Sequence, residues 1–463
     1  MAAISSSLLS YPLTLEEAPS VVRSHSASAM ALGAIALGAA LQINFGQYHP
    51  ASLMLLAVVL VCAMLSLTRV SLPPVMTILS AGLAIQVALL LICNPLATLT
   101  VSSASTLLPF RVGVVVGGIF ALRAIRHDSR AALFGLLGVH FLLGLWVLHV
   151  VPMPKVDVAI FQKEATAALL NGHNPYAMTF ANPYADAARV YGPGTFANGR
   201  LLFGYPYPPL TLLMILPGHL LGDFRLIQLL ATTLTGALIA FARPGRIATL
   251  AAALFLSTPR GFFVLEAGWT EPLVVVLLAA VVFLACRSSR WTLLVAALLL
   301  VSKQYLVFAL PLMIGLTPGL FKDRRRIAIS MLVAGTVSLP IAMWDLPAFM
   351  HSVVTLQFHQ PMRADALSFL PWTIGVTGLA IPGWIGLLAA VGAVVVALRC
   401  CEKSPARFAS AVAFVFLIFF ATNKQAFCNY YHFVIGAMCC AIAASQPGES
   451  IEMRSSPAAA GLG

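Results

Sequence analysis

The sequence predicts an all-α, polytopic membrane protein, and two features of its composition lead to this fold class. Of the 463 residues, 60% are hydrophobic and only 9% are charged, whereas about 25% are charged in an ordinary soluble domain. One membrane span needs about 20 mostly apolar residues, so this composition is enough for about 14 transmembrane helices and little else. A soluble enzyme, a disordered chain and a nucleic-acid-binding protein are therefore excluded.

The predicted spans are the apolar runs of the sequence, several of which are short. The run at 206–222 is not counted, because it opens with three prolines in four positions, ProTyrProPro. We interpret it as a helix that lies in the outer interface of the membrane without crossing it. In chain order, the predicted spans cover 28–46, 52–68, 75–94, 107–122, 132–152, 225–242, 247–259, 270–286, 291–303, 304–320, 327–344, 382–398, 407–422 and 428–445.

Groups of basic residues give the predicted orientation, because Lys and Arg mark the cytoplasmic side of membrane proteins. If every group is cytoplasmic, an even number of spans must separate successive groups, and the predicted spans satisfy this rule. Both termini are then cytoplasmic, and the formal net charge of +12 is mainly a topology signal. The groups are Arg123/Arg126/Arg130, Arg243/Arg246, Arg287/Arg290, Lys322/Arg324/Arg325/Arg326 and Arg399/Lys403/Arg407.

The predicted spans divide the chain into four parts. Residues 1–27 form a cytoplasmic segment, 28–130 contain four additional transmembrane helices, 131–445 form the main transmembrane module, and 446–463 form a cytoplasmic tail. The module contains one long outer loop, 153–224. The Ala- and Arg-rich, Lys-poor composition favours a bacterial plasma membrane, although an endoplasmic-reticulum membrane would meet the same physics.

The long outer loop is rich in Asn, Gly, Pro and Tyr, as in AsnGlyHisAsnProTyr at 171–176, AsnProTyr at 182–184 and TyrGlyProGly at 191–194. Such residues line carbohydrate sites, because Tyr stacks on sugar faces while Asn and His bond to hydroxyl groups. The same composition is also typical of any turn-rich loop. Both interpretations stay open at this point.

Ionisable residues next to the hydrocarbon are costly and are therefore functional candidates. Taken singly, each candidate is explained by snorkelling or by a local ion pair. Taken together, five outer segments place acids and bases on one membrane face, which favours a site for a phosphate-bearing lipid. The cations would bind the phosphate and a carboxylate would deprotonate a hydroxyl nucleophile. The acids are Asp157, Glu266, Glu271 and Asp365, and the bases are Lys303, Arg363 and Lys424.

No metal-binding or nucleotide-binding motif is present: the sequence contains no CxxC, HxxxH, HExxH or GxxxxGK[ST] pattern. The sequence therefore signals no metal or other cofactor, and a requirement for a divalent metal stays open.

A series of short motifs, in this order along the chain, resembles a known family. Asp157 stands in ValAspValAlaIlePheGlnLysGlu, and TyrProTyrProProLeu and ArgLeuIle follow it; GlyTrpThrGluProLeu, SerLysGlnTyr and AsnLysGlnAlaPhe…AsnTyrTyr come later. Together they resemble the GT-C superfamily of integral-membrane glycosyltransferases over roughly residues 130–445. The most similar branch is that of the bacterial polyprenyl-phosphate-mannose-dependent α-mannosyltransferases.

The resemblance implies a GT-C-like fold with interfacial helices in the outer loop, and a transferase activity. Asp157 would be the catalytic base, and a sugar, mannose or another hexose, would pass from a polyprenyl-phosphate donor to a glycan or glycolipid acceptor with inversion. Lys303, Arg363 and Lys424 would hold the donor phosphate. The full set of predicted substrate-binding residues is Glu266, Glu271, Lys303, Gln304, Arg363, Asp365, Lys424, Gln425, Asn429, Tyr430, Asn174 and Tyr176.

The chain departs from the family pattern at the catalytic position. Many members carry a pair of acids there, whereas Asp157 is followed by Val158. Glu164, Glu266 and Glu271 are the candidates for the second acid, and the sequence leaves the choice open.

Two other functions compete with the transferase. A lipid or solute transporter, or a flippase, would use the same charges to line a path, and it should show an inverted repeat with broken helices near the midplane. We find no convincing repeat, and the polar residues gather at one face, which favours the enzyme. A structural membrane subunit that positions a partner is the third possibility.

Overall fold

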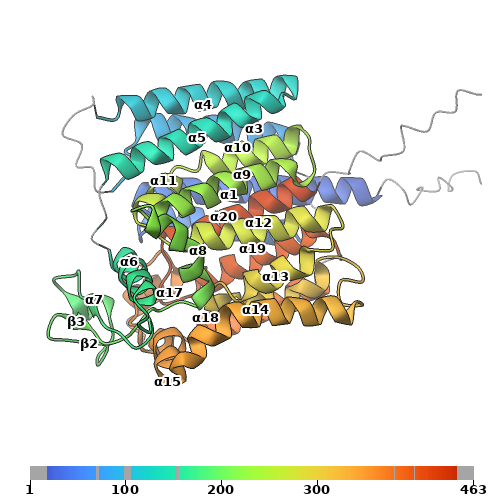
Figure 1. Cartoon of the computed structure of the whole chain (residues 1–463). Helices are drawn as coiled ribbons and strands as arrows, with labels where there is room; N and C mark the ends of the chain where they lie inside the picture. The colour runs from blue at the N-terminus through green and yellow to red at the C-terminus, as the bar shows by residue number, and fades with distance from the viewer. Residues whose placement is uncertain are drawn as a thin grey trace, which may run out of the picture.

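The computed structural model describes residues 18–68, 72–97, 106–151, 154, 156–379, 381–400 and 402–445, with side chains from residue 26 onward. The predicted tail at 446–463 and most of the predicted segment 1–27 lie outside these residues. In the described chain, long helices run side by side in one bundle (Figure 1). This arrangement confirms the predicted helical class.

The first half of the described chain contains nine helices and three very short strands. Their bounds are α1 Ala18–Ile43, α2 Pro50–Leu65, α3 Val75–Ile92, α4 Leu108–His127, α5 Arg130–Val150, α6 Asp157–Leu170, β1 Phe180–Ala181, α7 Ala187–Val190, β2 Phe196–Ala197, β3 Arg200–Leu201, α8 Pro209–Leu220 and α9 Arg225–Ala242.

The second half is helical throughout, with several short segments between the long helices. Their bounds are α10 Arg246–Leu256, α11 Gly261–Glu266, α12 Glu271–Cys286, α13 Thr292–Leu300, η1 Gln304–Ala309, η2 Pro311–Gly315, α14 Arg324–Trp344, α15 Leu346–Met350, η3 His351–Thr355, α16 Leu356–His359, α17 Phe369–Thr377, α18 Ile385–Cys400, α19 Pro405–Ala421 and α20 Cys428–Ala444.

Six described helices are long and apolar enough to cross a membrane. Seven more are apolar but shorter, with 10–17 residues each. The chain is therefore a helical membrane protein with several candidate spans, and the count of about 14 crossings stays a prediction. The six long candidates are Ser26–Ile43 within α1, Val75–Ile92, Leu108–His127, Arg130–Val150, Arg225–Ala242 and Arg324–Trp344.

The predicted helix at 304–320 is wrong in form. This stretch folds into η1 and η2, two short 3₁₀ helices, in which Leu306 N bonds to Lys303 O and Met313 N bonds to Leu310 O. Pro311 lacks an N–H group and cannot make the hydrogen bond that would continue an α-helix through it. The hydropathy of the run indicates its apolarity correctly, and Pro311 stands at the start of the second 3₁₀ helix.

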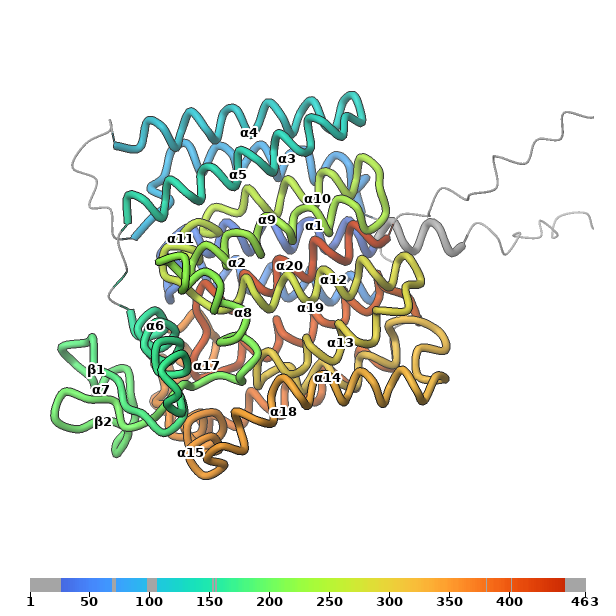
Figure 2. The backbone as a smooth tube through the Cα atoms, viewed as in Figure 1, coloured from blue at the N-terminus to red at the C-terminus, as the bar shows by residue number. Residues whose placement is uncertain are grey.

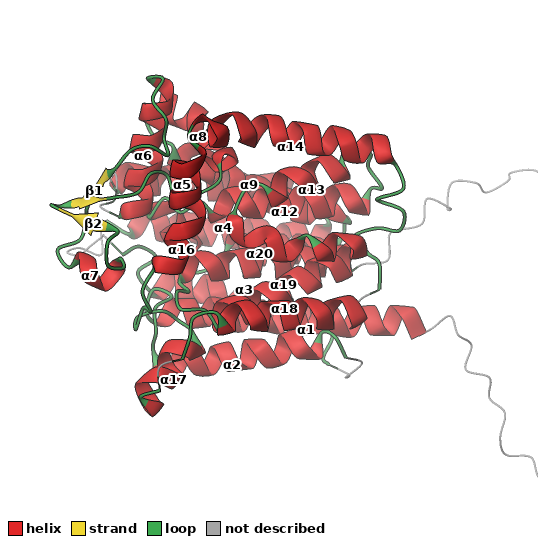
Figure 3. Ribbon diagram, turned by 90° about the horizontal axis from the view of Figure 1, so that it is seen from below, coloured by secondary structure: helices red, strands yellow, loops and turns green. Residues whose placement is uncertain are grey.

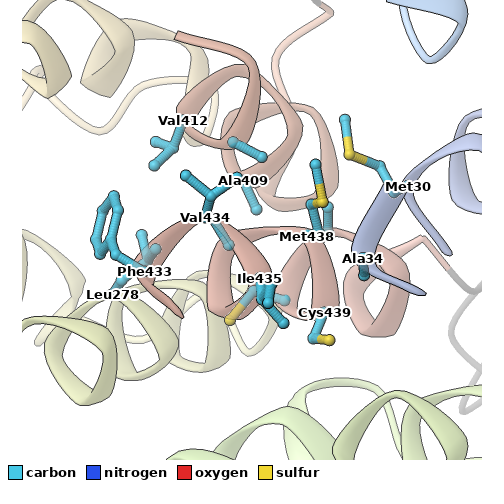
Figure 4. Packing of buried hydrophobic residues seen from close by; sticks show 14 of the residues in the cluster. Met30, Ala34, Leu278, Ala409, Val412, Phe433, Val434, Ile435, Met438 and Cys439 are labelled. Carbon is cyan, nitrogen blue, oxygen red and sulfur yellow. The ribbon is translucent and has the colours of Figure 1, made fainter. Parts of the chain in front are cut away.

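Helix α20 is the centre of the bundle. It is apolar on all sides, and nearly every residue from Cys428 to Ala444 is buried, as expected for a helix surrounded by others. Its neighbours include α1, α10, α12 and α19. Figure 4 shows Phe433, Val434 and Met438 of α20 among side chains of these neighbours. Because α1 reaches α20, the first of the four additional N-terminal helices is part of this core.

The long loop forms a cap at one end of the bundle, which we call the loop end. Helix α6 and the small sheet lie there, and the start of α1 and the end of α20 lie at the opposite end (Figure 2). Several predicted basic groups also lie at that opposite end: Arg246 bonds to the carbonyl of Arg126, and Arg287 to that of Phe241. Which end faces the cytoplasm stays a prediction.

A tight hairpin shapes the tip of the loop. Strand β3 lies between β1 and β2 and pairs antiparallel with both; Figure 3 shows β1 and β2 in yellow at the edge of the molecule. Asn198 and Gly199 join β2 to β3 with positive φ angles of 49° and 72°, the combination that a two-residue hairpin turn requires and that Asn-Gly readily adopts. The sequence analysis did not predict this sheet.

The predicted interfacial helix is present as α8, which begins directly after the prolines at 206 and 208. With 12 residues it is about 18 Å long, too short for a hydrocarbon core of about 30 Å. It packs against α6, α9 and α14. Its length fits the prediction that it does not cross the membrane.

Candidate functional site

Asp157 lies in the first turn of α6, at the loop end of the bundle. Its side chain is half-buried, and Oδ1 accepts a 2.7 Å hydrogen bond from the N–H of Val158. A negative charge is favoured at a helix N-terminus because the free N–H groups and the helix dipole point toward it. The backbone thus presents an accessible carboxylate at the position that the sequence predicts for the base.

Four tyrosines surround this carboxylate. Tyr191 donates a 2.7 Å hydrogen bond to Asp157 Oδ2, and the hydroxyl of Tyr184 accepts a 3.4 Å bond from Asp157 N. Tyr207 and Tyr430 lie close enough to Asp157 to interact with it electrostatically. The four side chains come from four separate segments, so the fold builds an aromatic wall around one acid.

The aromatic wall stays protonated next to the acid. Burial, and then the charge of Asp157, raise the pKa of both Tyr184 and Tyr191 above the usual value. Both residues therefore keep their hydroxyl protons at neutral pH, and Tyr191 remains a hydrogen-bond donor to Asp157. Tyr184, Tyr207 and Tyr430 are half-buried, and tyrosine rings of this kind provide flat faces and polar tips.

The loop after α16 brings a guanidinium group to the same place. Arg363 lies within electrostatic range of Asp157 and Tyr184, and it binds Asp365 through two hydrogen bonds of 2.8 and 2.7 Å. Burial opposes the charge of Asp365, but these bonds and the charge of Arg363 outweigh it and hold the pKa of Asp365 below its usual value. Arg189 approaches Asp365 at 4.0 Å from the other side.

A buried ion pair lies behind the aromatic wall. Lys303 Nζ is 3.0 Å from Glu271 Oε1, and the two side chains are 4% and 0% exposed. Lys303 Nζ also bonds to Thr270 Oγ1 and lies 4.0 Å from the centre of the Tyr207 ring, a cation–π geometry. Glu271 Oε2 is buried without a hydrogen-bond partner among the described residues.

Glu271, the acid of this ion pair, shares two tyrosine neighbours with Asp157. Tyr207 and Tyr430 interact electrostatically with both Asp157 and Glu271. Of the three candidates for a second acid, Glu271 is the one that shares neighbours with Asp157. Glu164 lies on α6, and its side chain makes no hydrogen bond or ion pair with the described residues. Two tyrosines thus lie within electrostatic range of both predicted site acids.

Three predicted binding residues brace the segment that carries Tyr207. Tyr176 is 2% exposed and its hydroxyl bonds to the carbonyl of Tyr207 at 2.8 Å. Asn174 Oδ1 accepts a bond from Tyr176 N and so shapes the preceding turn. Gln304 Nε2 donates to the carbonyl of Pro206 at 3.0 Å. All three side chains therefore position the tyrosine wall in this conformation.

The segment before α20 braces the Arg363 loop in the same way. Lys424 Nζ donates to the carbonyls of Phe358 and Gln360, and Gln425 Nε2 donates to Gln360 Oε1 at 3.2 Å. Burial lowers the pKa of Lys424. Asn429 is buried in the first turn of α20, beside Tyr430.

Glu266 contacts the segment after α3 and Arg260. It accepts a 2.8 Å bond from the N–H of Ala97 and interacts with Arg260. Arg260 is 3% exposed, donates to the carbonyls of Gln42 and Asn94, and stacks on Phe45. This polar cluster joins the N-terminal helices to α11.

The sequence analysis missed Tyr184, Tyr191 and Tyr207 as members of the site. Tyr184 stands in the motif AsnProTyr and Tyr191 in TyrGlyProGly, and both motifs are noticeable only for their composition. No spacing rule places them at Asp157, because their positions depend on how the loop folds back onto α6. Within the described residues, no group of three or more His, Cys, Asp or Glu side chains could hold a metal ion.

The site and fold together define a helical membrane protein with an acidic, tyrosine-lined group at one end of its bundle. Comparisons with protein-family models, curated proteins and solved structures found no match to this chain. The GT-C resemblance therefore stays a prediction from the motifs.

Proposed function

We propose that this chain is a membrane-embedded glycosyltransferase of the GT-C type. It transfers a hexose, mannose or a related sugar, from a polyprenyl-phosphate donor to a glycan or glycolipid acceptor. One observation carries the proposal most directly. Asp157 is the first residue of α6, and its carboxylate is half-buried. This carboxylate accepts a hydrogen bond from Tyr191 and lies within electrostatic range of Arg363.

The proposed reaction is a single displacement. Asp157 takes the proton of an acceptor hydroxyl, and the acceptor oxygen bonds to the anomeric carbon of the donor sugar. The bond from that carbon to the phosphate oxygen breaks, and polyprenyl phosphate leaves with the bonding electrons. Attack from the opposite face inverts the configuration, so a β-linked donor gives an α-linked product. General-base help of this kind contributes about 10²–10⁴-fold to the rate.

The neighbouring groups have matching roles in this proposal. Arg363 lies within electrostatic range of Asp157 and would contact the donor phosphate after loosening its bonds to Asp365. The tyrosine rings offer stacking faces for the sugar. Lys303 is held by Glu271 and Thr270 and would contribute through its charge, from behind Tyr207. Lys424 would keep the Arg363 loop in place.

The alternative of a transporter or flippase predicts polar groups along a path through the bundle. The acids and bases described here gather at the loop end instead, which supports the enzyme. A bacterial plasma membrane, with the loop end facing outward, is part of the proposal.

The test is transfer by the purified full-length chain in lipid nanodiscs. A panel of labelled polyprenyl-phosphate hexoses would be supplied with a membrane glycolipid extract as acceptor. We expect transfer from at least one donor by the wild type and none by Asp157→Asn. The matched control is Asp186→Asn in the same loop, because Asp186 is exposed and caps α7, a role that Asn fills equally well. Full activity of Asp157→Asn would refute the assignment.

A further inference from the structure

A cavity with polar and apolar lining lies at the loop end, and Asp157 is not among its lining residues. It has a volume of about 450 Å³ and lies between the last turn of α5, helix α6 and the turn that joins α8 to α9. Its lining includes Leu148, Lys163, His219 and residues 222–225. This volume is within the range of about 300–1,000 Å³ that is typical of small-molecule sites.

Helix α6 separates the cavity from the candidate active site. Asp157 and Lys163 are six residues apart on α6, which places them about 120° apart around the helix axis. Asp157 is held by Tyr191 on one side, whereas Lys163 lines the cavity on another. The two sites therefore have different linings although they share one helix.

The wall of the cavity is rigid and its own charges are balanced. Arg225 is 1% exposed and binds Asp223 through three hydrogen bonds of 2.7 to 3.1 Å. The same guanidinium bonds to the carbonyls of Val151 and Glu266. Asp223 is thus neutralised by Arg225, and a ligand would meet the remaining groups of the cavity.

Those remaining groups are a cation and an imidazole. Lys163 and His219 have no hydrogen-bond or ion-pair partner within the described part of the chain, and both line the cavity. Lys163 is exposed and His219 is half-buried, so both can reach a ligand. Lysine and histidine at an open, uncompensated position are suited to an anion such as a phosphate group.

Exposed leucines border the cavity. Leu220 and Leu221 are 68% and 74% exposed and follow His219 directly. Leu170, 46% exposed, is seven residues after Lys163 and so lies on the same face of α6. A polar pocket with basic residues and an apolar border is the arrangement that a lipid needs, with its head group in the pocket and its acyl chains along the leucines.

We propose that this cavity binds the phosphate-bearing head group of an anionic phospholipid, with Lys163 and His219 contacting the phosphate. The site is separate from the proposed transfer reaction and does not depend on it. It would hold α6, and with it Asp157, at a fixed depth against the bilayer.

The test measures lipid binding and not enzyme activity. The full-length chain would be purified in detergent and titrated with phosphatidylglycerol or phosphatidylcholine, and bound lipid would be counted by native mass spectrometry. We expect phosphatidylglycerol to bind at least ~10-fold more tightly than phosphatidylcholine. The variant Lys163→Ala/His219→Ala should lose this preference. Because neither side chain is buried, the variant should fold, which size-exclusion chromatography would check.

Two controls make the result decisive. Lys322→Ala removes an exposed lysine that comes just before the start of α14 and does not line the cavity. This variant should keep the preference for phosphatidylglycerol. Soluble glycerol 1-phosphate should not compete at equal concentration, because it lacks the acyl chains. Equal binding of phosphatidylglycerol by wild type and double variant would overturn the proposal, and so would full competition by glycerol 1-phosphate.

Discussion

Tyr191 donates a hydrogen bond of 2.7 Å to Oδ2 of Asp157, across 34 positions of the chain. This bond ties the first turn of α6 to the second half of the long loop. Tyr191 is 3% exposed, and burial together with the charge of Asp157 raises its pKa. The hydroxyl therefore stays protonated through the physiological range and orients Oδ2 of the carboxylate, while Oδ1 accepts the hydrogen bond from the N–H of Val158.

Removing that hydroxyl should slow the proposed transfer without unfolding the chain. A hydrogen bond to a charged group contributes about 1.5–3 kcal/mol, so Tyr191→Phe should lower kcat by about 10- to 100-fold. Because its pKa is raised, Tyr191 should not ionise below pH 10, and the deficit should be constant from pH 6 to 9. Initial rates with a labelled donor over this range give the measurement. Tyr184→Phe is the control, since its 3.4 Å contact is longer, and an equal loss in both variants would contradict the special role of Tyr191.

Removing one member of the Lys303–Glu271 pair should lower the free energy of unfolding strongly, and replacing both members should lower it by less than the sum of the two single losses. Removing one member of a buried ion pair leaves the other charge without its partner, which costs about 3–5 kcal/mol. Lys303→Met and Glu271→Leu should each lower the free energy of unfolding by such an amount, and the double variant should lose less than the sum. Unfolding by SDS, followed by circular dichroism, measures the cycle. Additive losses would show that the two side chains act independently.

The bonds between Arg363 and Asp365 should make the loop sensitive to acid. The pKa of Asp365 is lowered in the folded protein, so its contribution to stability is fully present above the ordinary aspartate pKa of about 3.9 and is lost as the pH falls through the lower, folded value. The Tm of the wild type should therefore fall below about pH 4, and Asp365→Asn should show a lower Tm at pH 7 and a smaller fall on acidification. Asp186→Asn, in the long outer loop before α7, should behave as the wild type, and a wild-type acid response in Asp365→Asn would exclude this carboxylate as its cause.

Part of the candidate site could be predicted, because apolar runs and groups of basic residues indicate which turns lie at the same end of the helices. The basic groups and the even number of spans between them placed Asp157, Glu271, Lys303 and Arg363 at turns of one face. The structure brings these four residues to one end, connected through Tyr207 and neighbouring tyrosines. Hydropathy and the positions of the basic groups depend on only a few neighbouring residues, so they can place residues at turns, whereas the orientation of that face stays a prediction.

The rest depended on contacts between distant segments. Glu266 stands at a turn of the predicted face, yet its carboxylate bonds to Ala97, 169 positions away, and nothing near Glu266 in the sequence signals that partner. The 304–320 run is apolar enough for a span, but its backbone forms two short 3₁₀ helices, the second of which begins at Pro311. Hydropathy measures the preference of side chains for lipid and contains no information on either effect.

Gly192 offers the sharpest test of how the loop segments fit together around Asp157. A Cβ atom at this position would lie 1.9 Å from the carbonyl oxygen of His359, a backbone atom that cannot rotate away. Gly192→Ala should therefore push Tyr191 and the segment before Arg363 apart. Transfer should fall at least as far as in Tyr191→Phe, while the helical bundle keeps its Tm, because the loop contributes little to the core around α20.

The matched control for Gly192→Ala is Gly375→Ala in α17, at the same end of the bundle. No atom lies within 4 Å of its added methyl group, and alanine is favoured over glycine inside a helix by up to about 1 kcal/mol. This control should keep full activity and the wild-type pattern of limited proteolysis. Gly192→Ala should gain cleavage between residues 185 and 200. If both variants match the wild type in activity and proteolysis, the contact between the 191–192 turn and His359 does not hold Asp157 in place.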